Sequence, residues 1–233
     1  MTKILSIGGE FASNKFIKKN EILDFYKKGT WTFTGRSALE IIIKKKFFHE
    51  KNIYIPIFNC PSIYTTIKKY FKKIIFYDLD KNFQPQLTKI KKNSIILIVN
   101  YFGLTNKMNF TEDITIINDL THSCVQKNNI KKNEYYFLSL RKHGICNFGG
   151  WTNIVSSKKK NTIKPNFLIN YRKKKFHYLI SNKKNIKIEK NLLKDLKKEE
   201  VKIIKNKKII NSTNISKITN YTLTNIIKIR KFN

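Results

Sequence analysis

The chain has 233 residues, of which 41% are hydrophobic and 13% aromatic. This composition excludes a disordered chain, and the length is sufficient for one sizeable core. The formal net charge of +33 points to anionic partners. Lys, Asn and Ile are nevertheless abundant in every part of the chain, as an AT-rich coding sequence would produce, whereas a nucleic-acid-binding protein concentrates its basic residues on one face. We therefore expect no nucleic-acid partner.

The cysteines, Cys60, Cys124 and Cys146, are widely spaced and form no CxxC pair, so neither a disulfide framework nor a zinc site is predicted. The apolar stretch Ile4–Ile7 is too short for the core of a signal peptide. No run approaches the roughly 20 apolar residues of a membrane-spanning helix. We expect a soluble, cytoplasmic protein with no membrane span and no metal.

Helical and extended patterns alternate from residue 35 onward. Gly35-Arg36-Ser37 opens a helix that is predicted to run to His49, because apolar residues recur on one face. A strand is predicted at Ile53–Phe58. The next helix, Ile63–Phe71, follows Pro61 and Ser62, which are ordinary helix-start residues.

Further elements follow in the same alternation. Strands are predicted at Ile74–Leu79, Ser94–Phe102, Ile114–Leu120 and Tyr135–Leu140, and a short helix at Gln84–Lys92. The strands that begin at Ser94 and Ile114 are continuous apolar runs, which is expected where both faces of a strand are buried. The pattern predicts an α/β three-layer sandwich with a mostly parallel central sheet.

Beyond residue 157 the chain becomes rich in Lys and Asn, with helices predicted at Lys190–Glu200 and Ser216–Phe232. We therefore divide it into a core domain, residues 1–157, and a Lys-rich remainder with a helical C-terminal extension, residues 158–233.

Polar residues follow the predicted strands at their carboxyl ends, where open α/β sheets bind ligands. Asp119, Ser139 and Lys142 all lie at such ends. A lysine can form a Schiff base with an aldehyde cofactor, a carboxylate can keep a pyridine nitrogen protonated, and a helix start with small residues, such as Gly35-Arg36-Ser37, can bind a phosphate. Together these residues predict pyridoxal 5'-phosphate chemistry.

Each of these residues also has an ordinary interpretation. Lys142 is one of many lysines and by itself would be a solvated surface residue. Asp119 by itself would be a turn former or a helix cap, and His122 a structural histidine. Only their order and spacing favour a common site.

Four motifs occur in an order that is known from one family. Thr34–Leu39 resembles its Ser-Gly-Thr-Ala-Ala-Leu phosphate turn, and Ile53–Pro56 resembles its Val-Ile-Val-Pro strand. Tyr77–Asp80 is similar to Val-Asp-Ile-Asp, and Asn100–Gly103 to His-Leu-Tyr-Gly. Residues 8–233 as a whole resemble the sugar aminotransferases of the DegT and StrS type, which have the aspartate aminotransferase-like fold.

The segment Asn118–Ser123 is similar to the family's Glu-Asp-Ala-Ala-His-Ala, and Lys142 precedes Gly149 by the seven residues that the family keeps between its lysine and a Gly-Gly pair. The resemblance implies that Lys142 is the catalytic lysine that binds the cofactor aldehyde. It further implies that Asp119 pairs with the pyridine nitrogen and that His122 lies beside the cofactor.

The chain departs from the family at three positions. Phe137 stands where many members carry the phosphate-binding serine, but Ser139 shares its face of the strand and can serve instead. Cys60 replaces the aromatic residue that stacks on the pyridine ring. Arg36 replaces a threonine, and either strengthens phosphate binding or blocks the phosphate turn. The predicted cofactor-binding residues are Asp119, His122, Gly35, Arg36, Ser37, Ser139 and Cys60.

The resemblance implies an aminotransferase that acts on a nucleotide-linked keto sugar in surface polysaccharide or amino-sugar biosynthesis. Glutamate would be the amino donor, and the active site would lie at the two-fold interface of a homodimer. Relatives continue into a C-terminal domain beyond the position where this sequence ends. One half of a split enzyme, or a non-catalytic remnant that keeps the scaffold as a binding module, therefore remains an alternative.

Overall fold

The computed structural model describes Tyr26 and residues 28–45, 51–104, 108–123, 131–143 and 149–155, together with Asn191, Lys194, Asp195 and Lys198. These four later residues are helical and exposed. They fall within the helix predicted at Lys190–Glu200. The rest of that helix, the whole helix predicted at Ser216–Phe232 and the domain boundary near residue 157 lie outside the described residues. Among the described residues, no helix has both the length and the apolar character needed to span a bilayer.

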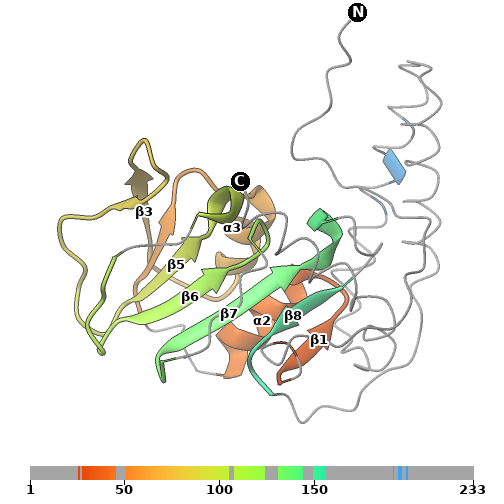
Figure 1. Ribbon diagram of the computed structural model, residues 1–233, viewed down its shortest axis with the longest axis horizontal. Coiled ribbons are helices and arrows are strands. Elements are labelled where there is room, and N and C mark those ends of the chain that lie inside the picture. Colours follow the sequence, from red (N-terminus) through yellow and green to blue (C-terminus); the bar gives the residue numbers. More distant parts are fainter. Residues whose placement is uncertain are drawn as a thin grey trace, which may run out of the picture.

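The described residues form an eight-stranded sheet in the order β1-β8-β7-β6-β5-β2-β3-β4. Its strands β2, β3, β5, β6 and β7 are mutually parallel, whereas β8 is antiparallel to β7 and β1, and β4 is antiparallel to β3. Figure 1 shows β5, β6, β7 and β8 in this sequence. The bounds are β1 Thr30–Thr32, β2 Ile53–Pro56, β3 Ile74–Leu79, β4 Pro85–Gln86, β5 Ile95–Val99, β6 Thr115–Asp119, β7 Glu134–Ser139 and β8 Gly150–Thr152.

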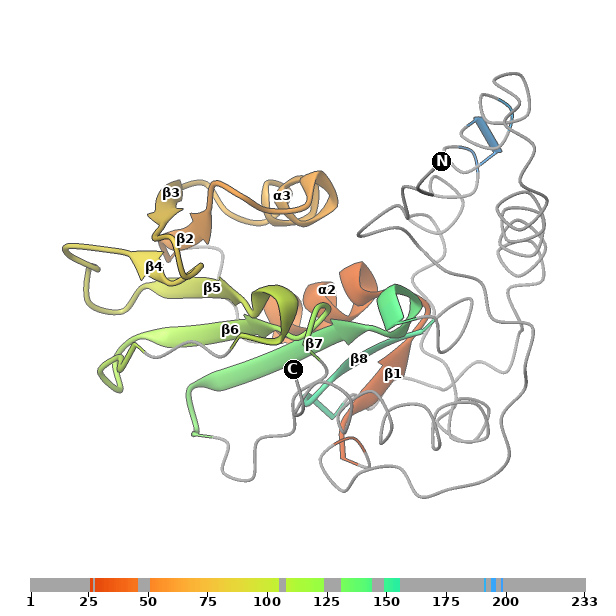
Figure 2. The same ribbon diagram turned by 45° about the horizontal axis from the view of Figure 1, so that its top comes forward.

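Two helices, α2 (Gly35–Lys45) and α3 (Pro61–Ile67), cover one face of the sheet. Figure 2 shows them on the same side of the strands. Helix α2 packs on β1, β7 and β8 and touches α3. The core between helices and sheet is formed by buried apolar side chains that include Leu39, Ile42, Ile55, Ile67, Leu97, Ile117 and Phe137.

The opposite face of the sheet has a second apolar cluster, built from the alternate residues of the same strands. Its buried members are Tyr54, Tyr77, Ile96, Ile98, Ile114 and Ile116. Both faces of β2, β5 and β6 are therefore buried, as in a parallel sheet of an α/β protein. The predicted α/β class with a mostly parallel central sheet is confirmed. The second helical layer of the predicted three-layer sandwich falls outside the described residues and stays a prediction.

The chain reverses its direction of progress across the sheet between β2 and β5. From β2 it proceeds through α3 to β3 on one side, and it then returns to β5 on the other side of β2. Loops that leave the carboxyl ends of β2 and β5 consequently diverge. Such a switch point opens a crevice where α/β sheets bind ligands.

One predicted element is wrong. No helix forms at Gln84–Lys92, where the structure instead has the short strand β4, paired antiparallel with β3. The Asp80 carboxylate accepts hydrogen bonds from the N–H groups of Asn82 and Gln84, both at 2.8 Å, and this local turn competes with a helix. Pro85, which lacks an N–H group, then sits at the sheet edge.

Other predictions need adjusted bounds. The helix that begins at Gly35 is described to Lys45, and the one predicted to end at Phe71 ends at Ile67. The strand predicted to continue to Phe102 ends at Val99, and a 3-10 turn, η2 (Tyr101–Gly103), follows. Strands β1 and β8 were not predicted, because three-residue strands are too short to show a period of two.

Candidate active site

A cavity of about 680 Å³ opens at the carboxyl ends of the parallel strands. It lies where the switch point predicts a crevice, and its volume is in the usual range for sites that bind small molecules. The lining comes from the carboxyl ends of β5, β6 and β7, from the loops that follow β2, β5, β6 and β7, and from the starts of α2 and α3. Its residues are Gly35, Arg36, Phe58, Asn59, Cys60, Pro61, Ser62, Ile63, Val99, Tyr101, Phe102, Asp119, Thr121, His122, Phe137, Ser139 and Lys142.

Asp119 is the last residue of β6 and is only 3% exposed. Asn100 holds this strand end, because both its backbone N–H and its side-chain amide donate to the Asp119 carbonyl. The Thr121 N–H donates to Asp119 Oδ1 at 2.8 Å. Burial raises the pKa of Asp119 from 3.8 to about 6, while the hydrogen bonds from Thr121 and the positive charge of Lys142 oppose that rise. The site therefore holds a buried carboxyl group that titrates near neutrality.

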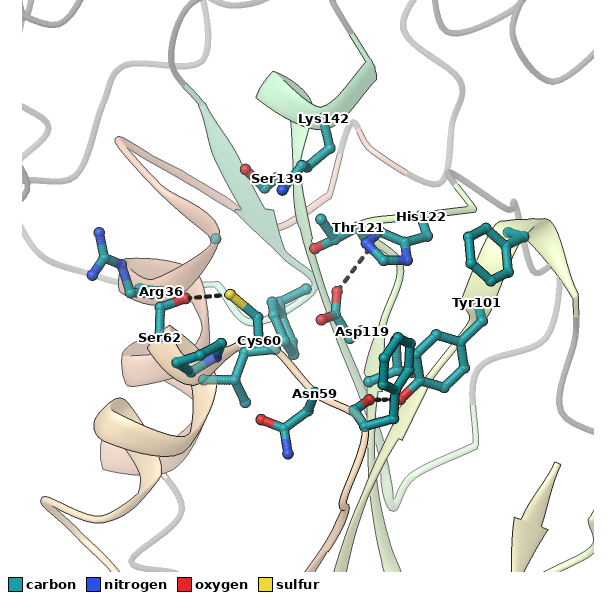
Figure 3. A pocket seen from close by; sticks show the side chains of 17 residues that line it. Arg36, Asn59, Cys60, Ser62, Tyr101, Asp119, Thr121, His122, Ser139 and Lys142 are labelled. Carbon is teal, nitrogen blue, oxygen red and sulfur yellow. Dashed lines mark hydrogen bonds between the residues drawn. The ribbon is translucent and has the colours of Figure 1, made fainter. Parts of the chain in front are cut away.

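Lys142 lies in the 3-10 turn η3 (Leu140–His143) that follows β7. The turn is tied to the sheet by the Leu140 N–H, which donates to the Gly149 carbonyl at 3.0 Å. Lys142 lines the same cavity as Asp119, and its charge lowers the Asp119 pKa. The predicted lysine and acid thus share one compartment, on neighbouring strand ends (Figure 3).

The start of α2 forms another wall of the cavity. Thr34 caps the helix, because its side-chain oxygen accepts the Ser37 N–H at 3.1 Å and its carbonyl accepts the Ala38 N–H. Gly35 packs so tightly on β7 that an added Cβ would lie 3.1 Å from the Ser139 Cβ. The helix N-terminus and the Ser139 side chain therefore lie next to each other at the cavity.

The predicted cofactor-binding residues are brought together with one exception. Gly35, Arg36, Cys60, Asp119, His122, Ser139 and Lys142 line the cavity, whereas Ser37 does not. The Ser37 hydroxyl instead shares a hydrogen bond of 3.0 Å with Thr34. Arg36 and Cys60 lie on the side of the cavity away from His122 (Figure 3), and the Cys60 thiol shares a hydrogen bond of 3.1 Å with Ser62. The roles of all eight residues stay predictions.

An aromatic wall was not predicted from the sequence. Phe58, Tyr101 and Phe102 line the cavity, and the His122 side chain points toward Asp119 (Figure 3). The pKa of Tyr101 is raised, first by burial and then by the negative charge of Asp119. These residues immediately follow β2 or β5, so applying the strand-end rule to every strand would have found them.

The cavity therefore combines an amine, a buried carboxyl group, a helix N-terminus and aromatic surface. The helix N-terminus, with Arg36 beside it, favours an anionic group such as a phosphate. The amine favours a carbonyl group. A small planar ligand that carries both groups and a basic ring nitrogen would match this set of side chains, and pyridoxal phosphate is such a ligand.

A scan against protein-family models and a search of curated proteins found no match. Solved structures do resemble the chain, among them a DegT DnrJ EryC1 StrS aminotransferase from Brucella abortus (12% identity, TM-score 0.43, 58% of this chain and 48% of that chain). A protein described as a sugar aminotransferase from Streptococcus pneumoniae, in its apo form, gives 13% identity and a TM-score of 0.45 over 63% of this chain and 45% of that chain. A 3-amino-5-hydroxybenzoic acid synthase gives 14% identity and a TM-score of 0.43 over 56% and 39%. The chain spans less than half of each of these proteins, and similarity at this level does not determine function.

Proposed function

We propose that this chain is a pyridoxal phosphate-dependent aminotransferase of the DegT and StrS type. The observation that carries the proposal is that Lys142 and Asp119 line one cavity at the carboxyl ends of β6 and β7, as the sequence motifs require. Bound pyridoxal phosphate supplies the electron sink for the transfer of an amino group. The protein has to bind it, orient it and move protons.

Each end of the cofactor has a matching group in this chain. Lys142 Nζ would hold the aldehyde end and, once released from it, would take and return the proton of the substrate. The Asp119 carboxylate would hold a proton on the ring nitrogen. The N-terminus of α2, with Gly35, Arg36 and Ser139, would bind the phosphate through N–H groups, a guanidinium and a hydroxyl.

The buried carboxyl group of Asp119 supports the proposal, because such a group is rare in a protein unless it serves a ligand. A carboxyl group that is 3% exposed, with its pKa raised to about 6, destabilises a fold once it is ionised. Groups of this kind gather at functional sites. A cationic ring nitrogen next to Asp119 would compensate for that burial.

The substrate class rests on the sequence motifs alone. We infer a nucleotide-linked keto sugar as amino acceptor and glutamate as donor, in surface polysaccharide or amino-sugar biosynthesis. A cytoplasmic homodimer and the division near residue 157 belong to the same proposal. Addition of glutamate to the cofactor-loaded protein should then release one equivalent of 2-oxoglutarate, which a coupled dehydrogenase assay measures.

Absorbance spectroscopy tests the cofactor. Pyridoxal phosphate added to the purified protein should produce the visible band of a cofactor bound covalently to a lysine, and Lys142→Ala should abolish it. Lys132→Ala, which removes an exposed lysine at the opposite end of β7, should keep the band. A protein that shows no such band after unbound cofactor has been removed would refute the proposal.

A binding module without catalysis is the second candidate. Cys60, which lines the cavity where the motif predicts a stacking aromatic residue, favours it, because a thiol offers less surface to a ring. This candidate predicts a visible band without release of a 2-oxo acid from glutamate or from any other amino donor. Release of one equivalent would exclude it.

A further inference from the structure

Two aromatic residues have backbone conformations that aromatic residues rarely adopt. Among the described non-glycine residues with positive φ are Phe83 at 58° and Phe102 at 52°. For bulky side chains such values mark strain, which persists only where the surroundings enforce it. Phe83 lies in the turn between β3 and β4, and Phe102 in the η2 turn after β5.

The two strained residues contact each other and lead to the cavity. The rings of Phe83 and Phe102 meet edge to face, with centroids 5.3 Å apart and planes at 73°. The Phe102 ring in turn stacks on His122 at 6.1 Å and 30°. We call Phe83, Phe102 and His122 the aromatic row.

The outer end of the aromatic row is anchored by hydrogen bonds of the β3–β4 hairpin. The Phe83 N–H donates to the Asp80 carbonyl and the Asp80 N–H donates to the Gln84 carbonyl, both at 2.9 Å. Two further N–H groups of the hairpin donate to the Asp80 carboxylate. The backbone from which the Phe83 ring projects is therefore fixed at the edge of the sheet.

Tyr101 supports the aromatic row from the side. Its ring lies 5.4 Å from Phe83 and 6.3 Å from His122. Its hydroxyl donates to the Phe58 carbonyl in the loop after β2. The rings thus connect the loops that follow β2 and β5 to the histidine.

Burial does not explain Phe102. Its side chain is 60% exposed, so removing apolar surface from water is a small part of its contribution. The turn itself does not require an aromatic residue, because glycine adopts the left-handed conformation without strain. Its ring contacts are instead with Phe83, His122 and Tyr101, at the cavity that all but Phe83 line.

We propose that Phe83 and Phe102 are positioning residues that hold the His122 imidazole at the cavity, directed toward Asp119. The consequence for cofactor binding rests on the proposed function, whereas the position of His122 does not. His122 lines the cavity and Asp119 is the group expected to pair with the ring nitrogen. A displaced imidazole would leave this end of the cavity wider and wetter, and cofactor affinity would fall.

The first test measures His122 in the cofactor-free protein. Its imidazole proton resonance, assigned with His122→Gln, reports the stacked Phe102 ring in an NMR spectrum. Phe102→Gly, which removes the ring and relaxes the backbone, should move the resonance toward that of a solvated histidine. Phe102→Tyr should keep it. Phe76→Ala is the matched control, because Phe76 is also exposed but pairs with Tyr64 away from the aromatic row.

The second test measures pyridoxal phosphate affinity from the visible band. Phe102→Gly should weaken binding about 3- to 10-fold, as expected for the loss of an aromatic pair. Phe83→Ala should weaken it by a smaller factor, while Phe102→Tyr and Phe76→Ala stay near wild type. The midpoint of thermal unfolding of Phe102→Gly should be retained, which separates positioning from general destabilisation.

Two results would overturn the inference. If Phe102→Gly leaves the His122 resonance unchanged, Phe102 is only a turn residue. If the resonance moves but the affinity does not, the aromatic row does not serve the cavity. A wild-type protein that binds no cofactor would instead refute the proposed function, and the NMR experiment would still decide whether Phe102 positions His122.

Discussion

Asp119 is a buried carboxyl group whose ionisation works against the stability of the fold. Burial raises its pKa from 3.8 to about 6, so the unfolded chain releases this proton at lower pH than the folded protein does. The free energy of unfolding consequently falls between about pH 4 and pH 6, and above pH 6 the loss is complete, at about 3 kcal/mol. Below pH 4 both states are protonated and there is no penalty.

Asp119→Asn should therefore stabilise the cofactor-free protein at pH 7.5. The amide cannot ionise, and its oxygen can still accept the Thr121 N–H that Asp119 accepts. We expect the free energy of unfolding in urea to rise by about 1–3 kcal/mol at pH 7.5 and to be nearly unchanged at pH 4. A variant that is less stable at pH 7.5 would show that the carboxylate is compensated within the fold.

The same substitution should impair function. Without a negative charge at the ring nitrogen, aminotransferase activity should fall at least about 100-fold. In the wild-type protein, cofactor affinity should also decline below about pH 6, where Asp119 becomes protonated. Titrations of the visible band from pH 5 to pH 8 measure this decline, and a similar decline in Asp119→Asn would mean that another group causes it.

A substitution of Cys60 is expected to strengthen the binding of pyridoxal phosphate. Cys60 lines the cavity and is exposed, so a larger side chain there meets no closed core. Cys60→Phe should tighten pyridoxal phosphate binding about 3- to 10-fold by providing a stacking surface. Cys60→Ser, which keeps the size but removes the thiol, should stay near wild type. Weaker binding by Cys60→Phe would mean that the ring of the ligand lies elsewhere.

At the scale of elements, two glycines let α2 approach the sheet. A Cβ on Gly150 in β8 would lie 2.3 Å from the carbonyl of Thr34, whereas one on Gly35 would lie 3.1 Å from the Ser139 Cβ. Gly150→Ala should therefore destabilise the protein by about 3 kcal/mol and Gly35→Ala by about 1 kcal/mol. Urea denaturation measures both, and equal values would contradict the difference in packing.

The prediction of elements from the sequence succeeded for strands whose apolar runs are bounded by polar residues. β3 has its predicted bounds, and β7 is shifted by a single residue, to Glu134–Ser139, because apolar runs bounded by polar residues leave few alternatives. The helix expected at Gln84–Lys92 does not form, although its apolar residues have the spacing of a helix. Leu87 and Ile90 have a helical spacing, yet they pack on the sheet from a loop.

At the scale of the whole molecule, the site was predictable as far as it depends on strand order. Asp119, Ser139 and Lys142 meet because parallel strands end at one edge. The aromatic wall was missed because the strand-end rule was not applied to β2 and β5, whereas the left-handed backbone at Phe102 leaves no mark in the sequence. Ser37 does not line the cavity, because its hydroxyl and its N–H are hydrogen-bonded to Thr34, and the sequence alone does not distinguish this cap from a phosphate contact.

Among the described residues, exposed lysines are spread over several elements rather than gathered on one. They occur on α2, directly after α3, in the β3–β4 hairpin and in the loops before β5 and β7, and they include Lys44, Lys68, Lys69, Lys81, Lys91, Lys92, Lys131 and Lys132. Duplex DNA should therefore bind only non-specifically, with a Kd no tighter than about 10⁻⁶ M at physiological salt. Fluorescence anisotropy over a salt series measures it, and tight binding to one sequence would revive a nucleic-acid function.

We propose that Lys142, one among the 48 lysine and arginine residues of the chain, holds the cofactor aldehyde opposite Asp119. Borohydride reduction of the protein with one equivalent of pyridoxal phosphate, followed by peptide mass spectrometry, identifies that lysine. We expect the added mass on the peptide that contains Lys142, and we expect it to disappear in Lys142→Ala. Label on a different lysine, or label spread over the surface lysines, would contradict it.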